Sequence, residues 1–316
     1  MRYLLNSSTD PYFNMALDEF CLENVVRDEP YFYLWRNRPS VIIGLNQNAW
    51  SEVNLDYLRE HGITLARRVT GGGAVYHDLQ NLNYTIIGAD PSPAPIVVAL
   101  RSLGVPAELT GRNDIFVEGR KVSGYARRVS KNQEIIHGTL MYDVDLDTLT
   151  HVLDTPESKM RAKGIESVKS RVANLKEYLP GFKSLDEVQA ALQEILSGGD
   201  SLMELSEAQL AEVRNMAKEK FSTWEFLYGR SREADLSRSA KLPCGTVRTD
   251  ISLDHGQITS LRFSGDFLFD EPSEGLASRL IGCRFERDLL VAALGNAMVS
   301  RYFRDTSAED ILNLLF

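Results

Sequence analysis

Cysteine, long apolar runs and an excess of basic charge are all scarce in this chain of 316 residues. The three cysteines, Cys21, Cys244 and Cys283, form no C-x-x-C pair, which argues against a disulfide scaffold and a structural zinc site. No stretch approaches the roughly 18 consecutive apolar residues of a membrane-spanning helix, and the first residues hold no run typical of a signal peptide. The net charge of -9 argues against a general nucleic-acid binder. We therefore expect a cytoplasmic protein with neither membrane nor nucleic-acid partners.

Several catalytic motifs are missing as well. The chain contains no G-x-x-x-x-G-K-[ST] phosphate loop, no H-E-x-x-H zinc motif and no G-x-S-x-G nucleophile turn. Its five histidines are scattered, and no two stand at metal-ligand spacing. These absences exclude a P-loop fold and argue against zinc peptidases and α/β-hydrolases.

The hydrophobic content of 43% and the charged content of 25% are typical of globular proteins, and the length predicts about two domains. Residues 14–28 favour a helix, and two more helical stretches lie near 54–61 and 95–103. Short β-rich runs surround them, at 31–35, 41–45, 65–69, 74–77, 82–87, 115–117 and 135–144. Because strands and helices do not strictly alternate, an α+β fold with a mixed or antiparallel sheet flanked by helices is favoured over a doubly wound sheet.

A polar, serine-containing stretch at 229–240 indicates a domain boundary. We expect a larger domain over residues 1–228, mostly helical after about residue 147, with capping-box candidates at Ser184 and Ser206. We expect a small α+β accessory domain over residues 229–316. It would begin with a hairpin of two alternating runs and continue with helical stretches at 275–283, 287–303 and 307–315.

Three consecutive glycines, at 71–73, stand between two β-rich runs. Glycine lets the backbone approach a ligand closely, and successive free N–H groups can surround an anion. Arg67, Arg68 and the hydroxyl of Thr70 stand beside the glycines, so a carboxylate or a phosphate would fit. The alternative is a flexible hairpin turn, which three glycines would weaken.

A second candidate segment begins with Gly111-Arg112-Asn113-Asp114 and continues into a basic stretch. Five basic residues and no acidic residue lie at 120–131. Lys121, flanked by small residues after a β-rich run, can act as a point charge on a phosphate or a carboxylate. Asp114 could hold Mg²⁺, which takes one or two carboxylates together with substrate phosphates. The alternative is a set of exposed hairpin charges.

Two further segments carry candidate groups. His137 lies in an otherwise apolar strand pattern, where a lone histidine is more often a core residue than a catalyst. Residues 159–175 form a basic, polar segment that includes Lys163, Lys169 and Arg171. Such a segment suits covering an anionic ligand or docking an acidic partner, and a solvated surface run is the alternative.

Taken in order, these segments resemble the lipoate–protein ligase A family over nearly the whole chain. Residues 67–78 match its specific pattern Arg-Arg-x-[Ser/Thr]-Gly-Gly-Gly-Ala-Val-x-His-Asp. Other matching blocks are 10–18, 34–37, 41–48, 111–114, 121–124, 137–140 and 163–175. Two positions depart from the family pattern. Gln80 stands where the family usually has glycine, and Ile136 stands where it often has a second histidine.

The resemblance implies the fold shared by lipoate and biotin ligases, with a catalytic domain followed by a small accessory domain. It also implies a two-step reaction, in which lipoate and MgATP give lipoyl-AMP and pyrophosphate, and a lysine ε-amine then takes the lipoyl group and releases AMP. ATP and Mg²⁺ are then co-substrates, and no tightly bound prosthetic group is expected. The implied acceptors are acidic lipoyl domains of 2-oxoacid dehydrogenase E2 subunits and the glycine cleavage H protein. We expect the enzyme to be a monomer.

The resemblance also assigns roles to residues of this chain. Lys121 would be the catalytic group, staying near the acyl-phosphate oxygen in both steps, and Asp114 is the candidate Mg²⁺ ligand. Lipoate and ATP would be bound by Arg68, Thr70, Gly71, Gly72, Gly73, Ala74, Val75, His77, Asn81, Asn113, Asp114, Lys121, His137, Gly138, Thr139, Lys163, Lys169 and Arg171.

Three other functions compete with ligation. A lipoyl or octanoyl transferase of the same fold, taking a pre-activated acyl donor, would carry much the same motifs. A thioester route needs a cysteine beside the lysine, and none of the three cysteines falls within 111–175. A non-catalytic lipoate-binding protein would have no need of Lys121 beside a complete glycine loop. Biotin ligases carry a Gly-Arg-Gly-Arg signature that this chain lacks.

Overall fold

The computed structural model describes residues 1–111, 113–130, 133–153, 171–199, 202–228, 236–254, 256–294 and 299–316. Its largest sheet consists of β1 (Arg2–Leu4), β2 (Tyr31–Trp35), β6 (Asn81–Gly88), β7 (Ala107–Thr110), β8 (Asp114–Val117), β9 (Arg120–Val129), β10 (Glu134–Met141) and β11 (Leu202–Met203). The strand order is β11-β1-β2-β6-β10-β9-β8-β7. β1 is parallel to β2 and β11, and the other neighbours are antiparallel, so the expected mixed sheet is confirmed.

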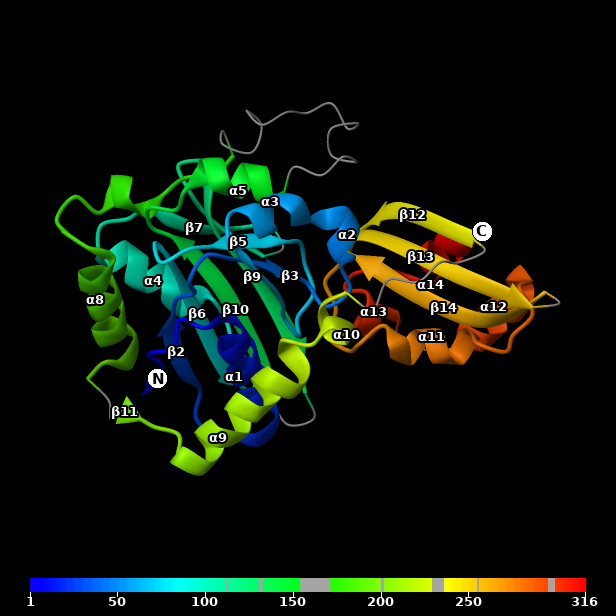
Figure 1. The fold of residues 1–316 in the computed structure, drawn as a ribbon, viewed down its shortest axis with the longest axis horizontal. Helices are drawn as coiled ribbons and strands as arrows, with labels where there is room; N and C mark the ends of the chain where they lie inside the picture. Colours follow the sequence, from blue (N-terminus) through cyan, green and yellow to red (C-terminus); the bar gives the residue numbers. More distant parts are fainter. Residues whose placement is uncertain are drawn as a thin grey trace.

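Helices cover both faces of this sheet, as Figure 1 shows. One face packs on α4 (Ala94–Ser102) and α8 (Leu185–Ser197), and the other packs on α1 (Pro11–Asn24), α9 (Glu207–Met216) and the π-helical turn η2 (Ala217–Phe221). β2 shows how the sequence achieves this, because successive side chains of a strand point to opposite faces. Phe32 and Leu34 join the core beside α4 and α8, while Tyr31, Tyr33 and Trp35 join the core beside α1.

A second, small sheet carries the glycine loop. It consists of β3 (Ser40–Ile43), β4 (Thr64–Arg67) and β5 (Val75–His77) in the order β4-β3-β5. Since β3 lies between the two strands that the loop joins, the alternative of a simple hairpin turn is wrong. The helices α2 (Ala49–Glu52), α3 (Leu55–Glu60) and α5 (Leu146–Val152) contribute to the core on this side.

The C-terminal part has a sheet and a core of its own, at the right of Figure 1. The antiparallel strands are β12 (Leu236–Leu242), β13 (Gly245–Asp254) and β14 (Gln257–Gly265), and the helices are α11 (Glu274–Leu280), α12 (Arg287–Leu294), α13 (Val299–Tyr302) and α14 (Ala308–Leu315). The chain after β14 returns to the glycine loop, where the Gly72 N–H donates to the Phe267 carbonyl at 3.1 Å. The division at residues 228 and 229 stays a prediction.

The structure corrects several expectations about single segments. Residues 120–129, interpreted as a basic stretch after a strand, are themselves the ten-residue strand β9. The polar stretch at 229–240 is not all linker, because β12 begins at Leu236. The 3-10 helix η1 (Leu175–Tyr178) and the short helix α10 (Trp224–Leu227) complete the described elements.

Both serines predicted to cap a helix do so. The capping box of Ser206 with Gln209 is confirmed, whereas the Ser184 side chain caps α8 by accepting from the Glu187 N–H alone. Within the described ranges, every helix is too short or too polar to span a lipid bilayer.

Candidate active site

A cavity of about 150 Å³ lies where the two sheets and α1 meet. Most residues expected at the site line it: Arg68, Gly72, Gly73, Ala74, Val75, His77, Asn113, Lys121, His137, Gly138 and Thr139. Apolar side chains that the sequence did not single out share the wall: Met15, Trp35, Ile42, Tyr125 and Ala126. The cavity can therefore take a ligand that is anionic in one part and apolar in another.

The glycine loop is held in shape by Arg68. The Arg68 guanidinium is buried, and its Nη2 lies 2.6 Å from the Gly71 carbonyl oxygen and 2.8 Å from that of Gly73. Gly72 has a φ of 92°, a conformation that residues with a Cβ rarely adopt. Burial lowers the pKa of Arg68 to about 10, which still leaves it a cation at neutral pH. Arg68 thus turns most of its N–H groups to the loop, and fewer remain for a ligand than the sequence indicated.

The glycine amides also differ from the expectation. The Gly72 N–H donates to Phe267, so this amide already has a carbonyl partner from the C-terminal part of the chain. A Cβ at Gly71 would lie 2.3 Å from the same Phe267 oxygen. The glycines therefore allow the C-terminal segment to approach closely, a use of this motif that the sequence did not predict.

The ring of His77 presents an N–H to the cavity because of two asparagines. Asn14 donates from Nδ2 to Asn37 Oδ1 at 2.8 Å, which turns the Asn37 nitrogen towards His77 Nδ1 at 3.1 Å. Since that nitrogen can only donate, Nδ1 of His77 accepts and Nε2 carries the proton. Nε2 is buried and has no hydrogen-bond partner within the described part of the chain. This N–H is a ready donor for an anionic ligand.

The charge on His77 is also fixed by its surroundings. Burial, and after it the charge of the neighbouring Arg68, lowers the pKa of His77 to about 3. At neutral pH the ring is therefore neutral. It contributes a directed hydrogen bond to the cavity, and the positive charge there comes from Arg68 and Lys121.

Lys121 and Asp114 meet because β8 and β9 form a hairpin. Asp114 lies opposite Gly124 in the strand register, and the Lys121 side chain folds back so that its Nζ is 2.7 Å from Asp114 Oδ1. A Cβ at Gly124 would lie 2.8 Å from that Nζ. The absence of a side chain at Gly124 thus gives the lysine its place at the cavity wall.

The Mg²⁺ role of Asp114 stays a prediction, and its carboxylate is paired with Lys121 in this structure. Among the described residues, no group of three or more His, Cys, Asp or Glu side chains could hold a metal ion. Mg²⁺ that is bound together with a nucleotide usually keeps several waters and takes one or two protein carboxylates beside the phosphates. Asp114 would hold such an ion, which would neutralise phosphate charge when bound.

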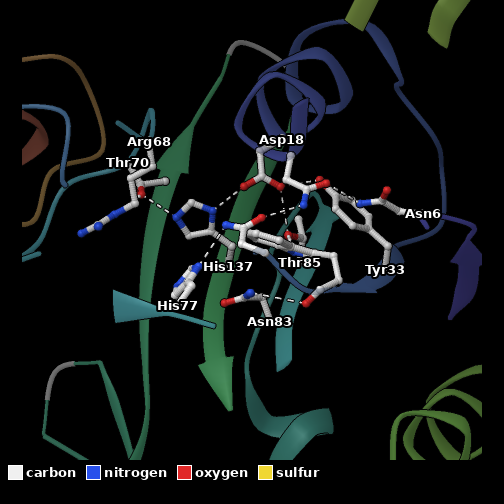
Figure 2. A network of polar contacts seen from close by, with 12 residues as sticks. Asn6, Asp18, Tyr33, Arg68, Thr70, His77, Asn83, Thr85 and His137 are labelled. Carbon is white, nitrogen blue, oxygen red and sulfur yellow. Dashed lines mark hydrogen bonds and ion pairs between the residues drawn. The ribbon is translucent and has the colours of Figure 1, made fainter. Parts of the chain in front are cut away.

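His137 belongs to a buried chain of polar contacts, shown in Figure 2. Its Nδ1 lies 2.6 Å from Asp18 Oδ2, and its Nε2 lies 2.6 Å from Thr70 Oγ1. Thr70 in turn accepts from Arg68 Nε at 3.1 Å. His137 is buried, as in the core-histidine alternative, but it also lines the cavity. Asp18 has no counterpart among the expected site residues, and its place inside a helix gave no signal of this contact.

Several expected residues do not line the cavity: Thr70, Gly71, Asn81, Asp114 and Arg171. Asn81 is buried behind the wall and donates from Nδ2 to Asn83, which does line the cavity. The Arg171 side chain is exposed, and only its carbonyl reaches the site by accepting from the Lys121 N–H at 2.8 Å. Lys163 and Lys169 lie outside the described residues.

A mixed sheet that places a glycine loop, a lysine–aspartate pair and a partly apolar cavity together suits an enzyme that activates or transfers an acyl group. Family comparison gives the particular class. Residues 10–197 match the lipoyl protein ligase A/B catalytic domain, and residues 231–315 match the bacterial lipoate protein ligase C-terminus. The chain belongs to the lipoyl protein ligase A/B family.

Individual relatives agree with this assignment. The chain is 35% identical over 321 residues to the lipoate-protein ligase LplJ of Bacillus subtilis strain 168, covering 97% of each protein. Its fold matches a crystal structure of P. falciparum LipL1 in complex with lipoate, with a TM-score of 0.82 at 24% identity over 99% of this chain and 97% of the other. It also matches a lipoate-protein ligase A structure bound with ATP, with a TM-score of 0.63 at 31% identity over 73% of this chain and 99% of the other.

Proposed function

We propose that this protein is an ATP-dependent lipoate–protein ligase. It activates free lipoate to lipoyl-AMP and transfers the lipoyl group to a lysine of an acceptor protein. The observation that carries the proposal is the cavity wall, which combines Lys121, the His77 N–H and the glycine loop with apolar side chains. A carboxylate and a phosphate suit the polar groups, and the dithiolane and alkyl chain of lipoate suit Met15, Trp35 and Ile42.

Each polar group has a role in the first step. The lipoate carboxylate attacks the α-phosphorus of ATP and displaces pyrophosphate, so two anions must approach each other. Lys121 neutralises part of that charge, and the His77 N–H donates to an anionic oxygen. Preorganised donors of this kind contribute on the order of 10²–10³ in rate.

The second step uses the same groups on a neutral nucleophile. The ε-amine of the acceptor lysine attacks the carbonyl carbon of lipoyl-AMP, AMP leaves with the electron pair of the broken C–O bond, and the nitrogen releases one proton to the solvent. Lys121 stabilises the oxygen charge that develops at the carbonyl. We propose acidic lipoyl domains of 2-oxoacid dehydrogenase E2 subunits and the glycine cleavage H protein as acceptors. We also propose action as a monomer in the cytoplasm, where three free cysteines suit the reducing conditions.

One assay tests the proposal and separates it from its alternatives. The protein is mixed with lipoate, MgATP and an unmodified acceptor domain, and pyrophosphate release and acceptor mass are followed. Lipoate-dependent pyrophosphate and a lipoylated acceptor are expected, and Lys121→Ala should lower adenylate formation by about 10²–10³-fold. Absence of lipoate-dependent pyrophosphate would overturn the ligase proposal. Transfer from supplied lipoyl-AMP alone would indicate a transferase, and binding without either step would indicate a lipoate-binding protein.

A further inference from the structure

Asp18 is a buried carboxylate that lies behind the cavity wall and does not line the cavity itself. It lies on α1 with a relative exposure of 1%. Taking a carboxylate out of water is costly unless hydrogen bonds replace the lost hydration. Three donors do so here. The Tyr33 hydroxyl and the Thr85 hydroxyl, the latter at 3.0 Å, donate to Oδ1, and His137 Nδ1 meets Oδ2 at 2.6 Å.

Two of these donors connect Asp18 to the cavity wall, and Figure 2 shows both of them, His137 and Thr85, in contact with Asp18. Thr85 accepts from the indole N–H of Trp35 at 2.9 Å, and Trp35 lines the cavity. His137 lines the cavity itself and continues through Thr70 to Arg68. Asp18 thus bonds to both Thr85, which holds Trp35, and His137, and so contacts two separate parts of the cavity wall.

The hydrogen-bonding capacity of each group gives a direction to these contacts, once the ring of His137 is taken as neutral. Ionised Asp18 can only accept, so the His137 ring donates from Nδ1. A neutral ring that donates from Nδ1 accepts at Nε2, so the Thr70 hydroxyl donates to His137 while its oxygen accepts from Arg68 Nε. Arg68 then uses its Nη2 on the carbonyls of the glycine loop. One continuous set of contacts therefore runs from the buried carboxylate to the loop that receives the anions.

We propose that Asp18 is a positioning residue for acyl activation, which acts through His137 and Thr70 to hold Arg68 and the glycine loop in their working shape. The inference rests on the proposed function. It assigns Asp18 no contact with substrate. Its effect is on the ring proton of His137 and, through that proton, on the orientation of the Thr70 hydroxyl.

The substitution Asp18→Asn tests this role without changing the size of the side chain. Two hydroxyl donors meet Oδ1 and one ring N–H meets Oδ2, so the single amide oxygen serves the hydroxyls best and the amide NH₂ turns to His137. The ring proton should then move to Nε2, which ¹⁵N spectra of histidine-labelled protein detect. The kcat of lipoate-dependent pyrophosphate release should fall at least about 10- to 100-fold, the loss typical of changing the outer partner of a metal-bound histidine. The KM for the acceptor domain should stay within about twofold.

A double-mutant cycle with Thr70→Val shows whether Asp18 acts through Thr70. If it does, adding Asp18→Asn to Thr70→Val lowers kcat little further, whereas independent effects would multiply. Thr70→Ser, which keeps the hydroxyl, should restore most of the activity that Thr70→Val loses. This pair of variants still decides the matter if Asp18→Asn fails to fold, since equal losses in Thr70→Ser and Thr70→Val would overturn the proposed route.

Glu19→Gln is the matched control. Glu19 follows Asp18 on α1, is also buried, and pairs with Lys220 at 2.6 Å on a different side of the helix. Its loss should lower stability but leave kcat and the His137 ring unchanged. An unchanged kcat or an unchanged ring spectrum in Asp18→Asn would overturn the inference, even where the wild type releases pyrophosphate normally. A wild type without that activity would instead contradict the proposed function.

Discussion

The side-chain nitrogen of Asn37 lies 3.1 Å from Nδ1 of His77, and this contact determines which ring nitrogen carries the proton. It leaves the Nε2–H of a neutral ring as a donor at the cavity. Two properties of His77 can therefore be tested separately: its preference for the neutral form and the direction of its hydrogen bond.

The preference for the neutral form predicts a pH dependence of stability. The pKa of His77 is about 3 in the folded protein, below the ordinary value of 6.5. As the pH falls, His77 therefore binds a proton in the unfolded chain but not in the folded protein. The contribution of His77 to the free energy of unfolding is complete above pH 6.5 and is lost as the pH falls towards 3. Between pH 7 and pH 5 the loss is about 2 kcal/mol. Urea unfolding at both pH values should show this difference in the wild type and not in His77→Gln. Equal pH dependence in the two proteins would contradict the burial of a neutral ring.

The direction of the hydrogen bond predicts a binding defect in Asn37→Asp. A carboxylate at this position accepts from Nδ1, so the ring proton leaves Nε2 and a lone pair faces the anionic ligand. We expect the KM for lipoate to rise about tenfold, since a buried acceptor is left facing an anion. Asn24→Asp, at the exposed end of α1, adds the same charge away from His77 and should leave the KM unchanged. A KM that rises equally in both variants would point to net charge as the cause.

The hairpin of β8 and β9 predicts an unusual effect of Gly124→Ala. The new methyl group meets the end of the Lys121 side chain, at 2.8 Å from Nζ, and this flexible group can move away at little cost in stability. The melting temperature should therefore stay nearly unchanged. The activity should fall at least about tenfold, because a displacement of about 1 Å in a catalytic group can cost 10² in rate. Gly181→Ala, where a Cβ meets no atom within 4 Å, is the control and should remain fully active. Full activity in Gly124→Ala would contradict the proposed catalytic role of Lys121.

The sequence predicted the mixed sheet and most of the cavity wall, because the glycine loop, His77 and His137 lie in segments with a local pattern. It could not predict Asp18 or Asn37, since each acts on a histidine far away in the chain. Asp18 meets His137 only after α1 has packed on β10. It also assigned no strand to residues 120–129, because these basic residues lack the apolar alternation of a strand, although they form β9 between β8 and β10.

The neighbouring arginines show the same limit of local pattern. Arg67 and Arg68 both stand beside the glycines in the sequence, and either could have faced an anion. Consecutive residues of a strand point to opposite sides. Arg68 lines the cavity, whereas Arg67 points to backbone carbonyls around residues 44–47 and 226–227.

The position of Cys21 predicts that no acyl-cysteine forms. The Cys21 side chain is fully buried in the core beside α1, and burial, followed by the nearby charge of Asp18, raises the pKa of its thiol far above neutral pH. A thiol of this kind is a poor nucleophile. Cys21→Ala should keep the rate of acceptor lipoylation within about twofold, and intact-mass measurements during turnover should show no thioester. If Cys21→Ala loses more activity than the loss of folded protein explains, the result would support a mechanism through a cysteine thioester.

The buried contacts of Arg67 predict that its substitution changes the stability of the protein and not its catalytic rate. Arg67 is 1% exposed, and its guanidinium donates to the carbonyls of Gly44, Leu45, Gln47, Phe226 and Leu227. Arg67→Met keeps much of the side-chain volume but leaves these oxygens without their donor, so the free energy of unfolding should fall by about 3 kcal/mol or more. In the exposed control Arg59→Met, which loses only a surface ion pair with Asp56, the free energy of unfolding should fall by less than about 1 kcal/mol. Because Arg67 does not line the cavity, the kcat of the protein that remains folded should match the wild type. A normal stability with a reduced kcat would instead place Arg67 among the groups that contact substrate.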